Sequence, residues 1–270
     1  MHGSSLTARC SRPIRVALLL FLVSLAANAA PPSFVIQEPF KVPAGTAPKE
    51  KFLLARQAAE RGDPAGQCLL GECFHNGWGC TKNPYLALTW LLRSASNGFF
   101  RAQFKVADLA VELHNFPMAQ RWYRACVERG EADAQFRLAN LYDANFKIAG
   151  RLPLFKVHTV SNYRTADWYM EDAEHRQTRA YPIAVDYTEA AKLYQKAANQ
   201  GHKAAQNNLA VMYAYGQGVR GDLLEAYKWF RIAGRGTTKE NGYPMVQNLQ
   251  TLVQSMTPKQ IEQADLRASK

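Results

Sequence analysis

Four cysteines are the side chains best suited to covalent chemistry in this sequence: Cys68, Cys73, Cys80 and Cys126. A catalytic thiolate needs a histidine or another base beside it, and no histidine stands at a spacing that would provide one. Cys73 and Cys80 are expected around the end of one helix, where a local disulfide could join them. Cys68 and Cys126 are a weaker pair, and the sequence does not choose among the three complete pairings. The alternative is that the thiols are buried and pack as small apolar groups.

The histidines, acids and glycines do not form a recognisable metal or phosphate site. Glu171 and His175 lie one helical turn apart, but the chain has no His-x-x-x-His or Cys-x-x-Cys spacing. A charged helix face is the simpler interpretation of that pair. The triplets at 77–79 and 216–218 are Gly-x-Gly, yet they lack the Gly-Lys-Ser/Thr of a phosphate loop and follow no predicted strand. We therefore expect no metal, no cofactor and no catalytic residues.

The first 29 residues have the features of a secretory signal peptide. Arg9, Arg12 and Arg15 form a positive region, residues 16–27 are an apolar run, and Ala27-Asn28-Ala29 offers small residues for cleavage. A membrane anchor is the alternative, but the run is short for a span of about 20 residues. No later apolar stretch is long enough. We expect a periplasmic or secreted protein without a membrane span after cleavage.

The chain is basic, with a formal net charge of +11. The leader contributes three arginines and no acids, so the mature chain keeps 11 − 3 = +8. This charge is compatible with an anionic partner, such as an envelope component, or with solubility alone. Lysine and arginine are scattered along the chain and are not clustered with aromatic residues, so nucleic-acid binding is not expected.

Two stretches of the sequence, 67–98 and 206–236, are similar to each other. Six positions correspond in type and spacing: Leu70, Phe74, Gly77, Gly79, Ala87 and Trp90 match Leu209, Tyr213, Gly216, Gly218, Ala226 and Trp229. Two further copies open at Ala102-Gln103 and Ala134-Gln135. The period of about 36 residues is typical of helix-pair repeats. In the third copy we predict an insertion at about residues 144–185.

A pair of helices in each copy explains this spacing. Leu209 and Tyr213 are four residues apart and share a helix face, and Ala226 and Trp229 form the matching face of the second helix. Small residues let helix axes approach to about 8–10 Å. We predict an all-α fold with four repeats over 64–236.

Both ends of this repeat array are expected to be covered by single helices, which keep such arrays soluble. A capping helix is predicted at 49–63, after a flexible segment at 30–48. Capping helices are also predicted within 237–270, where Thr257, Pro258 and Gln260 form a capping-box pattern.

The repeated residues resemble those of the Sel-1-like repeat family, a tetratricopeptide-like group. Its pattern is A-x-x-x-L-G-x-x-Y-x-x-G-x-G-V, then D-x-x-x-A-x-x-W-[YF]-x-x-A-A-x-x-G-x-x-x-A-Q. The resemblance covers most of residues 50–236. It implies a right-handed α/α solenoid of antiparallel helix pairs that binds partners along a concave face. It also implies an adaptor role, often in exported bacterial proteins, and no shared catalytic residues.

Some cysteine-rich exported members of this family have been described as binding or slowly hydrolysing penicillins. Their cysteines join the second helix of one repeat to the first helix of the next. Here Cys126 occupies the second-helix position, but the matching first-helix residue is Ala134. An exported enzyme with penicillin-binding or weak beta-lactamase activity is therefore one alternative function. A cell-wall glycan binder, acting through Trp78 and the basic surface, is another.

The expected partner-binding surface is formed by first-helix positions outside the Leu/Tyr stripe. Aligning the repeats places ten residues there, namely Leu69, Asn76 and eight that we predict as partner contacts: Glu72, Lys105, Asp108, Arg137, Asn140, Asn208, Val211 and Tyr215. Trp78, in a glycine-flanked loop, could be an exposed anchor or could fold onto its own repeat. The insertion contains a predicted helix with Trp168 and Tyr169 and could be an interface or a cap. The favoured function is a non-catalytic scaffold for a protein or peptide partner, whose identity stays open, as does the oligomeric state.

Overall fold

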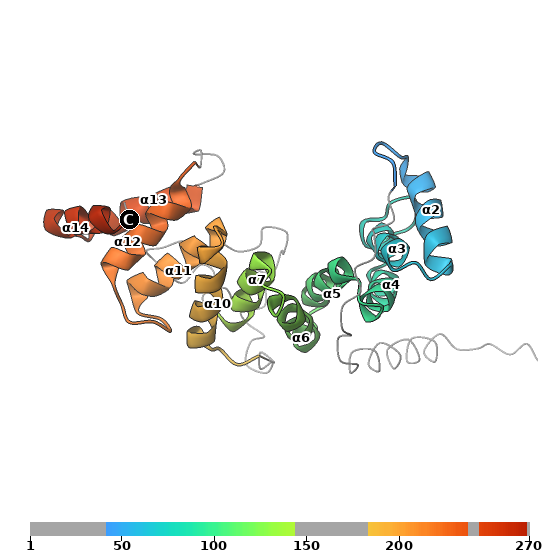
Figure 1. The fold of residues 1–270 in the computed structure, drawn as a ribbon, viewed down its shortest axis with the longest axis horizontal. Coiled ribbons are helices and arrows are strands. Elements are labelled where there is room, and N and C mark those ends of the chain that lie inside the picture. Colours follow the sequence, from blue (N-terminus) through green and yellow to red (C-terminus); the bar gives the residue numbers. More distant parts are fainter. Residues whose placement is uncertain (1–41, 144–182, 237–242, 269–270) are drawn as a thin grey trace, which may run out of the picture. The chain divides into compact units, whose positions relative to one another are not determined.

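The computed structural model describes residues 42–143, 183–236 and 243–268, and every regular element in these ranges is an α helix (Figure 1). The chain divides into two compact units, residues 1–106 and 107–270, which meet within α5. In chain order the helices are α2 (Pro48–Glu60), α3 (Pro64–Asn76), α4 (Pro84–Ser96), α5 (Phe100–Glu112), α6 (Phe116–Val127), α7 (Ala132–Tyr142), α10 (Tyr187–Asn199), α11 (Lys203–Tyr215), α12 (Leu223–Gly234), α13 (Tyr243–Gln254) and α14 (Pro258–Ala268). Among the described helices, none is both long and apolar enough to cross a membrane.

In the first unit, α3 packs against both α2 and α4. Close approach depends on small residues: a Cβ on Gly71 would overlap the Leu91 side chain of α4, and one on Gly66 would overlap Ala58 of α2. The rings of Phe52 and Phe74 meet edge to face, with centroids 5.6 Å apart. The core of this unit is a cluster of buried residues on α2 and α3: Ala55, Ala59, Leu70 and Cys73.

In the second unit, α7 and α10 pack as a helix pair, although residues 144–182 separate them in the sequence. The backbone N–H of Asp186 donates to the carbonyl of Tyr142 at 3.1 Å, which holds the two ends of that segment together. Ile183 is already buried. The predicted insertion, apart from residues 183–185, lies outside the described residues. The same unit contains the pairs α6–α7, α10–α11 and α11–α12.

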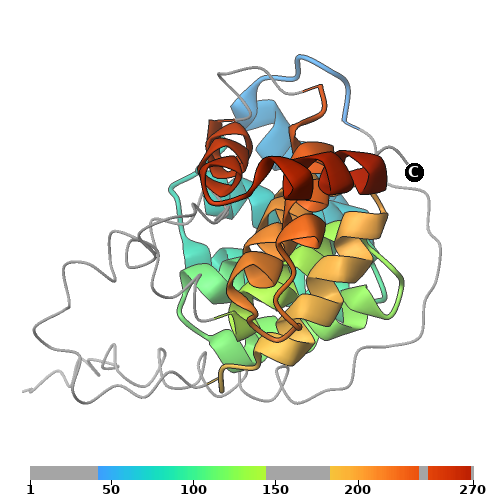
Figure 2. The same ribbon diagram turned by 90° about the vertical axis from the view of Figure 1, so that its left-hand side faces the viewer.

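The C-terminal helices cover α12. Both α13 and α14 pack against it (Figure 2). Tyr227 of α12 donates from its hydroxyl to Asp265 of α14 at 2.8 Å. The predicted capping box is confirmed, because the Thr257 N–H donates to Gln260 Oε1 at 2.8 Å and the Gln260 N–H donates to Thr257 Oγ1 at 3.4 Å.

Polar side chains begin the second helices, and glycines end the first helices α3 and α11. Asn83 accepts hydrogen bonds from the first turn of α4, and Asp222 does the same for α12. The second glycine of each Gly-x-Gly loop has a positive φ, +71° at Gly79 and +68° at Gly218. A Cβ at Gly79 would overlap the carbonyl of Pro48, where α2 begins, and a Cβ at Gly218 would overlap that of Tyr187, where α10 begins. Each loop therefore packs directly on the start of the helix that precedes its own helix pair.

Candidate partner-binding groove

A groove of about 280 Å³ lies in the first unit, beside α2, α3 and the start of α5. We call it the Trp78 groove. Apolar side chains form much of its wall: Val42, Leu69, Trp78 and Phe99. The remaining lining includes charged side chains from three helices: Lys51 of α2, Glu72 of α3 and Arg101 of α5. Two residues predicted as partner contacts, Glu72 and Trp78, thus meet in one concave site.

Trp78 is held in place by the end of α3. The helix ends at Gly77 in the left-handed conformation, and the Trp78 N–H donates back to the Cys73 carbonyl at 3.0 Å. The half-buried indole packs against the core cluster of α2 and α3. Lys51 Nζ lies 3.9 Å from the ring centroid, within range of a cation–π interaction. Trp78 therefore packs against α2 and α3, and the same ring also lines the groove.

Glu72 forms the charged centre of the site. Its Oε1 lies 3.2 Å from Arg101 Nη2 and 3.7 Å from Lys105 Nζ. Only 10% of the Glu72 side chain is exposed, whereas 67% of Arg101 and 42% of Lys105 are exposed. The carboxylate is thus covered and the two cations face water, so that the groove presents positive charge to a partner.

The thiols of the described cysteines are neutral at physiological pH. Burial raises the pKa of Cys68 and of Cys126 to about 12, and that of Cys73 to about 11. Burial also raises the pKa of Cys80. Cys68 lines the Trp78 groove, with Glu72 raising its pKa further and Arg101 lowering it. Because a thiolate is the reactive form, these environments do not activate a cysteine nucleophile.

The Cys73–Cys80 disulfide proposed from the sequence is not formed in the structure. All four described cysteines are free thiols, and Cys80 Sγ donates to the Cys73 carbonyl at 3.4 Å. The two residues do lie together, at the end of α3 as expected. Cys73 is buried in the core cluster, and the sulfur of Cys80 packs against it. The bond therefore stays a prediction for an oxidising compartment.

Asp108 and Arg137, two other predicted contacts, bind each other. Arg137 Nη1 lies 3.2 Å from Asp108 Oδ1, and both side chains are largely covered. The hydroxyl of Tyr123 also donates to Asp108 Oδ1, at 2.6 Å. This group joins α5, α6 and α7 within the second unit. The polar atoms of these three side chains therefore bind one another and hold the packed helices together.

Three further predicted contacts, Asn140, Asn208 and Val211, are buried, as Glu72 is, which corrects their assignment to an exposed face. The hydroxyl of Tyr194 donates to Asn140 Oδ1 at 2.6 Å, and Asn208 Nδ2 donates to the Tyr194 oxygen at 3.2 Å. These three residues belong to α7 and α11, each of which packs between two other helices. Tyr215, at the end of α11, is half-buried. Trp168 and Tyr169 lie outside the described residues.

Comparison with known proteins identifies the repeat. Residues 64–99, 132–144, 161–202 and 203–236 match the family described as Sel1 repeat. The chain is a Sel1-repeat protein. The match at 161–202 starts inside the predicted insertion at 144–185, so part of that segment is similar to Sel1 sequence. The matched ranges leave out residues 100–131, which contain the predicted copy that opens at Ala102-Gln103. Its helices α5 and α6 are joined by a short connection.

Three known proteins are similar to this Sel1-repeat chain. Chitin synthase regulatory factor 3 of Schizosaccharomyces pombe is 25% identical over 43% of this chain and 13% of its own length. An uncharacterized protein of Neisseria meningitidis is 30% identical over 64% of this chain and 37% of its own length. The chain thus spans well under half the length of these curated relatives. The crystal structure of a Sel1 repeat protein from Oxalobacter formigenes has a TM-score of 0.50 and 19% identity, covering 79% of this chain and 84% of that one. The predicted all-α repeat solenoid is confirmed.

The sequence interpretation missed the buried glutamine that opens the Sel1 repeats. Gln67 accepts from Asn97 Nδ2 at 3.1 Å, and Gln135 accepts from Gln200 Nε2 at 2.8 Å. Asn97 and Gln200 each stand at the end of the second helix of the same pair, directly before a glycine. The glutamine near the start of each of these first helices and the polar residue before Gly98 or Gly201 were visible in the sequence. Together they would have predicted this bond, which ties the open ends of the α3–α4 and α7–α10 pairs.

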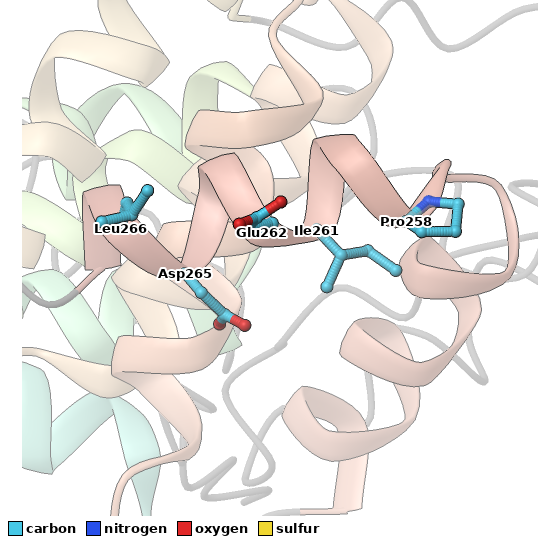
Figure 3. Close-up of a pocket in the computed structure, with 5 residues that line it drawn as sticks. All are labelled: Pro258, Ile261, Glu262, Asp265 and Leu266. Carbon is cyan, nitrogen blue, oxygen red and sulfur yellow. The ribbon is translucent and has the colours of Figure 1, made fainter.

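A second hollow, of about 520 Å³, lies on α14 (Figure 3). All five lining residues belong to this single helix: Pro258, Ile261, Glu262, Asp265 and Leu266. Asp265 already accepts from Tyr227 and pairs with Arg231, both on α12. A depression along one helix offers no second wall, and we therefore place the candidate site at the Trp78 groove.

Proposed function

We propose that this protein is an exported, non-catalytic adaptor that binds a protein partner in the Trp78 groove. The proposal rests on one observation. The groove combines the fixed ring of Trp78 with exposed cations that cover the carboxylate of Glu72. Aromatic residues and arginine in a concave site are the side chains that dominate protein interfaces. Sel1 repeats usually mediate protein–protein interaction, which supports the same class of function.

The non-catalytic part of the proposal rests on the chemistry of the candidate nucleophiles. The described thiols are held protonated by burial, so none is poised for acyl transfer. Among the described residues, no group of three or more His, Cys, Asp or Glu side chains could hold a metal ion. The export part rests on the leader-like residues 1–29.

A crosslinking pull-down from envelope extract tests the proposal. Three baits are compared: the chain itself, the variant Arg101→Glu, and a variant in which a short Gly-Ser linker replaces residues 146–184. The linker is feasible because Tyr142 and Asp186 are already joined by a backbone hydrogen bond. We expect one protein partner to be lost with Arg101→Glu and retained by the linker variant. A partner lost only with residues 146–184 would place binding in that segment and contradict the proposal.

A matched control keeps the charge change and moves it away from the groove. Lys192 of α10 is 65% exposed and pairs with Glu189 of its own helix at 3.6 Å. Lys192→Glu changes the net charge by the same amount as Arg101→Glu. Equal loss of the partner with both variants would indicate attraction by overall charge and would contradict binding in the groove. Cell fractionation, with leader cleavage read by mass spectrometry, tests the export part separately.

A further inference from the structure

The charges around the Trp78 groove are unbalanced. Among the described residues that line the groove or pair with its carboxylate, three are cations, Lys51, Arg101 and Lys105, and one is an acid, Glu72. The carboxylate is covered by the cations it binds, while Arg101 is two-thirds exposed. A partner approaching from solvent therefore meets positive charge from α2 and α5 before it meets the acid. Such a field favours an anionic partner and accelerates its association.

The groove also has apolar walls. Val42, Leu69 and Phe99 line it together with the half-buried face of Trp78. Its volume of about 280 Å³ lies just under the range of about 300–1,000 Å³ that is usual for small-molecule sites. A site of this size suits one apolar side chain projecting from a longer chain. The Cys68 thiol in the lining is neutral and adds no charge that would oppose an acid.

We infer that the groove binds an acidic peptide segment of the partner, with one apolar side chain seated against Trp78 and Leu69 and with carboxylates on both sides of it. This inference rests on the proposed function and adds the chemical class of the ligand. Arg101 and Lys105 would receive one acidic flank, and Lys51 the other. Because Lys51 already lies over the indole and Arg101 is held by Glu72, the cations are positioned before the peptide arrives.

Fluorescence anisotropy with synthetic peptides tests the ligand class on the purified chain. The probe is a fluorescein-labelled peptide in which one Phe stands between two pairs of Glu. Replacing the four Glu by Gln should weaken binding about tenfold or more, and replacing Phe by Ala should weaken it about fivefold. Higher salt should weaken the Glu peptide and leave the Gln peptide nearly unchanged. Equal binding of the Glu and Gln peptides would overturn the inference, as would failure of the Glu peptide to bind.

Variants of the chain test whether the peptide binds in the groove. Arg101→Gln with Lys105→Gln should weaken the Glu peptide about tenfold, and Lys192→Gln with Lys196→Gln on the exposed face of α10 should leave it unchanged. Because the first pair of changes also uncovers Glu72, Lys51→Gln provides a second test that leaves Glu72 and its cations intact. Equal weakening by the groove and control pairs would overturn the inference.

Two further results separate this inference from the proposed function. If vesicles of phosphatidylglycerol compete with the Glu peptide as well as unlabelled peptide does, the groove recognises anionic surfaces and not a peptide, which overturns the inference. If the pull-down yields a partner that depends on Arg101 but the Glu peptide binds no better than the Gln peptide, the adaptor function stands and the ligand class is wrong.

Discussion

Lys51 Nζ lies 3.9 Å from the ring centroid of Trp78, and this contact joins α2 to the loop that follows α3. The indole also packs against the core cluster of the first unit. One wall of the groove is therefore built by the fold itself, before any partner is bound. A wall positioned in advance lowers the entropic cost of binding, because fewer side chains must be ordered on association.

The Gly-x-Gly loops should be sensitive to the smallest side chain. Gly218→Ala places a Cβ against the Tyr187 carbonyl at a positive φ, so the free energy of unfolding should fall by about 2 kcal/mol or more. Gly130→Ala is the matched control, since its φ is +83° with nothing within 4 Å of the added Cβ, and it should cost about 1 kcal/mol. Urea unfolding measures both variants. Equal losses would show that the close approach to α10 contributes nothing.

The hydroxyl of Tyr194 should stabilise the second unit. Tyr194→Phe leaves Asn140 Oδ1 and Asn208 Nδ2 without this partner inside the core, and we expect a loss of about 1–3 kcal/mol. Tyr85→Phe is the control, because Tyr85 is 58% exposed and should change stability by less than about 0.5 kcal/mol. Chemical denaturation of both variants provides the comparison. A Tyr194→Phe protein as stable as the Tyr85→Phe protein would contradict this account of the buried polar groups.

Stability should fall as the pH rises above 9. Burial raises the folded-state pKa of Cys68 and Cys126 to about 12 from an ordinary value of 9.0, so folding favours the protonated thiols. That contribution is complete below pH 9 and is lost as the pH rises from 9 towards 12. At pH 10 each thiol should cost about 1 kcal/mol. Denaturation from pH 8 to 10.5 should therefore show a smaller slope in the Cys68→Ala, Cys126→Ala double variant than in the unchanged chain; an unchanged slope would contradict the prediction.

The chain should not hydrolyse penicillins. Three of its four described thiols are buried, and burial raises the pKa of all four. The residue at position 134, where a disulfide partner of Cys126 would stand, is an alanine. Nitrocefin mixed with the purified chain should therefore turn over no faster than with heat-denatured chain. Turnover that is saturable, and abolished by a single cysteine-to-alanine change, would contradict the non-catalytic account.

The repeat architecture could be predicted from the sequence because it depends on local patterns. Paired apolar residues four apart and Gly-x-Gly loops act within one helix or one connection, and the structure has them where they were expected. The capping box at Thr257 and Gln260 is of the same kind. Patterns of this type determine the local backbone geometry without contacts from distant parts of the chain.

The binding residues were harder to predict because exposure depends on neighbouring helices. Asn140 aligns with Glu72, and Asn208 aligns with Leu69. Both asparagines bond to Tyr194 inside the second unit, whereas Glu72 and Leu69 line the groove. Lys51 and Arg101 come together from helices that are about fifty residues apart in the chain. No local pattern marks such a pair, since only the packing of α2, α3 and α5 brings them to one site.

Photo-crosslinking from within the groove tests the central claim most directly. A benzophenone amino acid is placed at Leu69, which lines the groove, and in a second protein at Leu266, which is 61% exposed on α14. Irradiation in envelope extract should join one protein partner to the Leu69 position, and Arg101→Glu in the same chain should abolish that adduct. A partner captured from Leu266 and not from Leu69, or an adduct at Leu69 that persists with Arg101→Glu, would contradict the Trp78 groove as the binding site.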